Sequence, residues 1–114
     1  MEEISIEKLM ELYVNTIDKC GTYLLSEDDM VIGYNIFEEF DTGVISFLHA
    51  DILQKLNDTG LISDEMVYKS CILRNLVLEL QKGDDWNVNA IRNSPYWRNV
   101  LELANEIKGC LSGD

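Results

Sequence analysis

The stretch SPYWRNVLELANEIK, residues 94–108, decides the fold class of this chain. Ser94 is a good helix cap, and Pro95 occupies the first helical position, where its missing N–H group costs nothing. The apolar residues that follow recur at steps of three and four, as they do on one face of a helix. They are Trp97, Val100, Leu101, Ala104 and Ile107. The pattern predicts a helix from Pro95 to about Lys108 that buries this face.

The same periodicity extends upstream and predicts a wholly helical chain. Ser5, Ser26 and Ser63 are expected to cap helices, because a serine hydroxyl accepts a hydrogen bond from a backbone N–H of the first turn. The expected helices cover residues 5–20, 27–40, 44–57 and 63–81, and residues 86–93 are expected to form one or two further turns. Glycine-containing breaks at residues 41–43, 58–60 and 83–85 separate them. We therefore predict an all-α fold: one helical domain over residues 1–114, a bundle of five to six helices with no sheet.

Aromatic and cysteine side chains are expected to contribute mainly to the core. Tyr34 belongs to an apolar stripe with Met30, Phe37 and Phe40, and Trp97 lies on the stripe of the last helix. Trp86 follows two acids in an expected loop, where partial exposure and core packing are equally compatible with the sequence. The three cysteines are odd in number and widely spaced, so we expect free thiols that contribute only packing. They are Cys20, Cys71 and Cys110.

The negative charge of the chain is concentrated in its first third. There are 21 acidic and nine basic residues, a net charge of −12. Residues 1–41 hold 11 acids and two bases, a net of −9, whereas residues 42–114 hold ten acids and seven bases, a net of −3. Such a concentration is typical of a docking face for a cationic partner, and interface hot spots are enriched in aromatic residues. The predicted partner-binding residues are Glu27, Asp28, Asp29, Glu38, Glu39, Asp41, Tyr23 and Trp86.

Several function classes are disfavoured by the same sequence. A polyanion repels nucleic acid and anionic lipid, so we expect no direct nucleic-acid binding and no membrane association. His49 is the only histidine, and the spacings of zinc, calcium and phosphate-binding motifs do not occur. We therefore expect no metal, no cofactor, no catalytic residue and no enzymatic activity. The chain begins Met1-Glu2-Glu3 without a basic or apolar leader, so we expect a cytoplasmic protein.

Two stretches carry a family resemblance. They are YNIFEEFDTGVISFLH, residues 34–49, and WNVNAIRNSPYWRNVLELANEIK, residues 86–108. Together with small size, helicity and acidity, they resemble the immunity proteins of bacterial contact-dependent inhibition and polymorphic-toxin systems. The adjacent tyrosine pair of the helical colicin-nuclease immunity family does not occur in this chain. The resemblance implies a protein that neutralises a cognate toxin domain, often a basic nuclease, inside the producing cell.

Our leading hypothesis is an immunity-type inhibitor, monomeric or homodimeric, whose first acidic helices steer a basic toxin. The alternatives are a DNA-mimicking or regulatory acidic protein-binding module and a helical homo-oligomeric structural subunit. A small enzyme ranks last, because it would need a concave pocket around His49.

Overall fold

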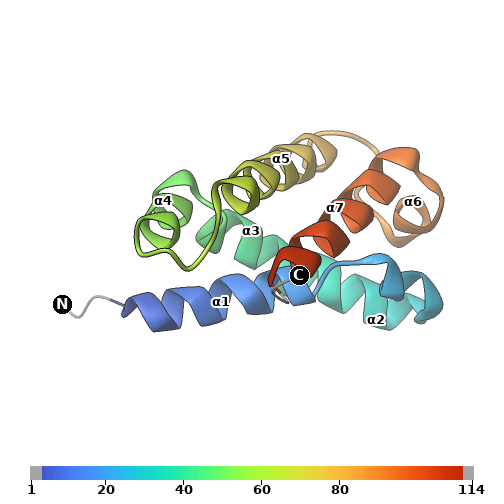
Figure 1. The fold of residues 1–114 in the computed structure, drawn as a ribbon. Coiled ribbons are helices and arrows are strands. Elements are labelled where there is room, and N and C mark those ends of the chain that lie inside the picture. The colour runs from blue at the N-terminus through green and yellow to red at the C-terminus, as the bar shows by residue number, and fades with distance from the viewer. Residues whose placement is uncertain (1–3, 112–114) are drawn as a thin grey trace.

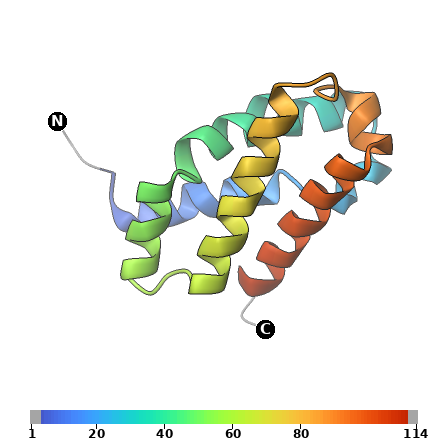
Figure 2. The ribbon, with the colours of Figure 1, turned by 90° about the horizontal axis from the view of Figure 1, so that it is seen from above.

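The computed structural model describes residues 4–111, which form helices in two layers (Figures 1 and 2). The elements are α1 (Ile6–Asp18), η1 (Thr22–Ser26), α2 (Asp29–Gly33), η2 (Tyr34–Phe40), α3 (Asp41–Phe47), α4 (Ala50–Asp58), α5 (Asp64–Gln81), α6 (Val88–Asn93) and α7 (Pro95–Leu111). One layer holds α1 and the segment from α2 to α3, and the other holds α5 and α7. Helices α4 and α6 lie at opposite ends. The described residues contain no strand, which confirms the all-α bundle.

The second predicted helix is longer than expected. Elements α2, η2 and α3 run without interruption through residues 29–47, and η2 is π-helical. The predicted break at residues 41–43 is therefore wrong. Gly43 is present for packing: a Cβ there would lie 2.6 Å from Cγ2 of Thr16 on α1, closer than real side chains approach. Gly43, which the sequence pattern assigns to a turn, instead allows α1 and the long helix to touch.

The chain turns instead at Leu48 and His49, so the predicted helix over residues 44–57 is divided in two. Helix α3 ends at Phe47, and His49 caps α4, where its Nδ1 accepts a hydrogen bond from the backbone N–H of Asp51 at 3.2 Å. His49 is exposed, and the hydrogen bond occupies its Nδ1 at the start of the helix.

Two of the three predicted upstream caps are confirmed. Ser5 accepts from the N–H of Lys8, and Ser63 accepts from the N–H of Met66. Ser26 does not cap α2, because the chain first makes the 3₁₀ turn η1, and Asp28 then accepts from the N–H of Val31 at 2.9 Å. At the start of α7, the Ser94 hydroxyl accepts from the N–H of Tyr96 at 3.1 Å, as predicted.

The core is built around the predicted stripe of α7. All five of its members are buried, and Tyr13 crosses from α1 to donate or accept a 2.7 Å hydrogen bond with Ser70 of α5. Burial raises the pKa of Tyr13 to about 12. Trp86 is half-buried between two rings, 5.1 Å from Phe37 and 5.5 Å from Trp97 between ring centroids.

The predicted stripe of the second helix is only partly right. Met30 is 85% exposed and Tyr34 is 57% exposed, whereas Phe40 is buried. The buried apolar positions follow a four-residue step through Ile32, Ile36, Phe40 and Val44 to Leu48, the residue after the long helix. Met30 and Tyr34 each lie two positions before a member of this series, about 200° around the helix, so the predicted stripe has the wrong phase. The wider turns of the π-helical segment suit the four-residue step.

The cysteines are free thiols, as expected. Cys20 is buried, and burial raises its pKa to about 12. Cys71 and Cys110 are half-buried and pack against the core. Helix α7 continues to Leu111, three residues beyond the predicted end near Lys108.

Gly43→Ala is expected to lower the free energy of unfolding by about 1–3 kcal/mol, because the added methyl overpacks the contact with Thr16. The matched control is Gly109→Ala in α7, where an added Cβ meets nothing within 4 Å. It should raise the free energy by up to about 1 kcal/mol through helix propensity. Chemical denaturation measures both, and equal shifts of the two variants in one direction would rule out the close contact.

Candidate partner-binding site

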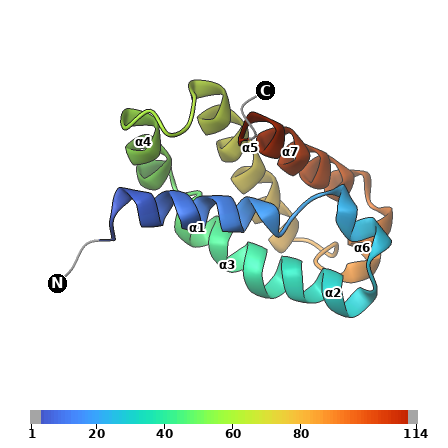
Figure 3. The ribbon, with the colours of Figure 1, turned by 60° about the horizontal axis from the view of Figure 1, so that its bottom comes forward.

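Helix α1 and the long helix of residues 29–47 lie side by side (Figure 3). The groove between them is the largest of the three hollows described in the structure. Its volume is about 670 Å³. The walls come from the second half of α1 and from η2 and α3. The lining residues are Leu12, Asn15, Thr16, Asp18, Lys19, Glu38, Glu39, Thr42, Gly43 and Phe47. The contact of Gly43 with Thr16 holds the two walls together at the base of the groove.

Three carboxylates and one base line this groove. Asp18 is the last residue of α1, and Glu38 and Glu39 lie on the π-helical segment of the facing wall. None of the three forms an ion pair within residues 4–111. Lys19 is the only base among the lining residues. The groove is therefore acidic, and its charge is left uncompensated by the fold.

Tyr34 stands beside these acids. Its hydroxyl donates a 2.9 Å hydrogen bond to Glu39 Oε1, and this bond is the main cause of a raised pKa of Tyr34. The ring is 57% exposed and so remains available for contact. The predicted core position of Tyr34 is therefore wrong: the residue lies on the surface, next to the groove residue Glu39. Exposed tyrosines of this kind are common anchors in protein interfaces.

The first predicted acidic cluster is largely occupied by contacts within the fold. Asp28 caps α2, and Asp29 Oδ1 accepts from Arg92 Nη2 at 2.8 Å and Nε at 3.0 Å. Arg92 Nη2 also donates to the carbonyl of Glu27 at 2.7 Å. Arg92 lies on α6, so the cluster joins the start of the long helix to α6 at one end of the molecule. Only the side chain of Glu27 is free of such contacts within the described residues.

The side chain of Asp41 lies on a different side of the long helix from those of Glu38 and Glu39. Its carboxylate accepts a hydrogen bond from Gln81 at the end of α5 and does not line the groove. Burial raises the pKa of Asp41, and the bond from Gln81 opposes that shift. The three acids do not close a helix as the sequence pattern predicts: they lie in the middle of the long helix, and only Glu38 and Glu39 line the groove.

The two predicted aromatic contacts have different environments. Tyr23 is 42% exposed, donates to the carbonyl of Asp18 at 2.8 Å, and carries Lys108 Nζ 4.7 Å from its ring centroid. Burial is the largest cause of the lowered pKa of Lys108. Tyr23 thus borders the acidic groove through Asp18. Trp86 belongs to the aromatic stack of the core, and its half-buried ring does not line the groove.

Asp18 and Lys19 were not singled out by the sequence analysis. Asp18 is exposed at the C-terminal end of α1, where an acid opposes the helix dipole, and this unfavourable placement is the signal that could have identified it.

Among residues 4–111, no three histidine, cysteine or carboxylate side chains gather as metal ligands do. His49 lines none of the three pockets described here. No helix in that range is long and apolar enough to cross a membrane. Comparison of the chain with family models, curated proteins and solved structures yields no match.

Arg92→Met is expected to lower the free energy of unfolding by about 1–2 kcal/mol, because it removes the bonds that join α6 to η1 and α2 while keeping the apolar stem. Arg98→Met is the matched control. The Arg98 side chain is exposed and has no hydrogen bond or ion pair within the described residues, so a change below about 0.5 kcal/mol is expected. Thermal unfolding followed by circular dichroism distinguishes the two, and equal losses would contradict a structural role of the Asp29–Arg92 pair.

Proposed function

We propose that this protein is a cytoplasmic immunity-type inhibitor that binds a basic toxin domain through the groove between α1 and the long helix. The observation that carries the proposal is the uncompensated acidity of that groove, where Asp18, Glu38 and Glu39 face one base. The resemblance of residues 34–49 to immunity proteins points to the same segment, which supplies one wall of the groove.

Charge and apolar contact have separate roles in this proposal. Exposed ion pairs contribute only about 0.2–1 kcal/mol each, so three carboxylates do not supply the affinity of an inhibitor. They act on the association rate, because an acidic hollow attracts a cationic partner before contact. Affinity comes from apolar surface, which Leu12 and Phe47 offer inside the groove and Tyr34 beside it.

The π-helical segment supports the same location. Such segments are rare and frequently occur at functional sites. Here the segment carries Tyr34, Glu38 and Glu39, and its wider turns bring Tyr34 and Glu39, five residues apart, within hydrogen-bonding distance on the side away from the buried Ile36 and Phe40. A regular α-helix of the same sequence would not bring this combination of side chains to one face.

The partner to be tested is the C-terminal domain encoded by the neighbouring upstream open reading frame. We expect this domain to arrest the growth of a bacterial host when expressed alone, and coexpression of the present chain to restore growth. A domain that is harmless to the host, or growth arrest that coexpression does not relieve, contradicts the immunity role.

The variant Asp18→Lys/Glu38→Lys is expected to slow association with this domain by about tenfold or more at low ionic strength, and to weaken the salt dependence of the rate. The matched control is Asp58→Lys/Glu102→Lys. Asp58 is the last residue of α4, as Asp18 is of α1, and Glu102 is an exposed mid-helix acid like Glu38. Stopped-flow association measures both pairs. Equal slowing would mean that net charge alone, and not the groove, attracts the partner.

A further inference from the structure

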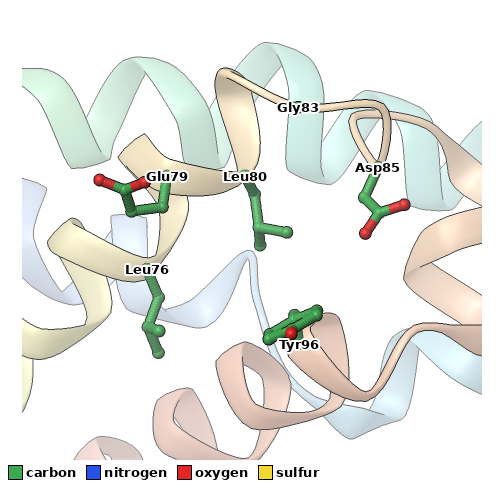
Figure 4. A pocket seen from close by; sticks show the side chains of 6 residues that line it. All are labelled: Leu76, Glu79, Leu80, Gly83, Asp85 and Tyr96. Atoms are coloured by element: carbon green, nitrogen blue, oxygen red, sulfur yellow. The ribbon is translucent and has the colours of Figure 1, made fainter.

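A small apolar pocket lies in the opposite layer, where the end of α5 meets the first turn of α7 (Figure 4). Its volume is about 230 Å³, and it is lined by Leu76, Glu79, Leu80, Gly83, Asp85 and Tyr96. Figure 4 shows Leu80 pointing toward the ring of Tyr96. Pockets for small organic ligands usually measure about 300–1,000 Å³. This smaller hollow suits a single side chain.

A polar hollow of about 420 Å³ adjoins this pocket and shares Asp85 and Tyr96 with it. Its further lining residues include Asp84, Asn87 and Asn89, and neither hollow is lined by a lysine or arginine. The carboxylates of Asp84 and Asp85 form no ion pair in the described part of the chain. The composite site therefore offers an apolar cavity beside two free negative charges.

The loop that carries these acids is held in place by the core. Asp85 accepts a 2.7 Å hydrogen bond on its carbonyl from Trp97 Nε1, and Asp84 accepts one of 2.9 Å from Asn87 Nδ2. Trp86 follows these two acids in the sequence, and its ring packs against Trp97 in the core. A site that is already ordered loses little conformational entropy when a ligand binds.

We propose that the two hollows form a docking site for a polypeptide segment in which an apolar side chain is followed by lysine or arginine. The apolar side chain occupies the pocket of Leu76, Leu80 and Tyr96, and the cation lies between Asp84 and Asp85. Glu79 adds a third carboxylate. It forms an ion pair with Lys82, at 3.3 Å between Nζ and Oε1, and both side chains are exposed. Such a pair is weak, so a cation of the ligand can replace Lys82. This site lies in the other layer from the acidic groove and does not depend on it.

The test uses the peptide acetyl-GLRG-amide and NMR of protein labelled at leucine methyl groups. We expect saturable shifts of the Leu76 and Leu80 methyl signals. The peptides acetyl-GSRG-amide and acetyl-GLEG-amide should bind more weakly, the first by roughly tenfold or more because the buried leucine is lost. Asp84→Asn/Asp85→Asn should remove the preference for GLRG over GLEG while leaving the backbone bonds of the loop in place.

Gly83→Trp provides a steric test. Gly83 lines the pocket, and a Cβ added there meets nothing within 4 Å, so a larger side chain can start from this position without a clash at its first atom and is expected to block the ligand. Gly109→Trp is the control, at an equally open glycine that does not line the pocket. Loss of the peptide-induced shifts in the first variant alone is expected.

Two results would overturn the proposal: no saturable shift of either methyl signal, or equal binding of GLRG and GSRG. Methyl shifts that change with protein concentration in the absence of peptide would also overturn it, because a second copy of the chain would then occupy the pocket. The role proposed for the acidic groove is tested by the separate growth-rescue experiment. Failure of either proposal therefore leaves the other testable.

Discussion

The approach of α1 to the long helix at Gly43 and Thr16 is the contact on which the rest of the molecule depends. There is no room for a Cβ at Gly43, so the two helices touch at this level. The groove lies beside this contact, because Gly43 and Thr16 are both among its lining residues, and the packing of the two helices turns one side of the long helix inward. Ile36, Phe40 and Val44 are buried in consequence, and the acids of the π-helical segment are left on the wall.

The acidic residues of the first third divide into two groups with different energetic roles. Asp28 caps α2 and Asp29 binds Arg92, so both stabilise the fold. Asp41 accepts a hydrogen bond from Gln81, which opposes the effect of its burial. Asp18, Glu38 and Glu39 form no ion pair among the described residues, although Asp18 also interacts electrostatically with Lys108. In the proposed function these three acids speed the encounter with a basic partner.

The fold class could be predicted because helical periodicity and caps are local signals. The stripe of α7 and the caps at Ser5 and Ser63 follow from residues within one or two turns of each other. The errors arose where a tertiary contact overrode the local signal. Gly43 was interpreted as a break, although it is required by Thr16, which lies 27 positions earlier in the sequence.

The candidate site could be predicted only in part for the same reason. Glu38 and Glu39 were identified from charge, but their assembly with Asp18 depends on the crossing of two helices. The predicted burial of Tyr34 is wrong because apolar residues occur on both sides of this helix, and only the packing against α1 decides that Ile32 and Ile36, and not Met30 and Tyr34, face the core. Arg92, which engages Asp29, lies 63 positions away from it and could not be paired with it from spacing alone.

The central claim is that this groove, and not the net charge of −12, attracts cationic chains. The most direct measurement is a titration with hexalysine, followed by amide shifts of isotopically labelled protein at low ionic strength. The account predicts the largest shifts in the second half of α1 and in η2 and α3, and predicts that Asp18→Lys/Glu38→Lys abolishes them. Shifts spread evenly over the acidic residues of α4, α5 and α7, or unchanged in that variant, would contradict the account.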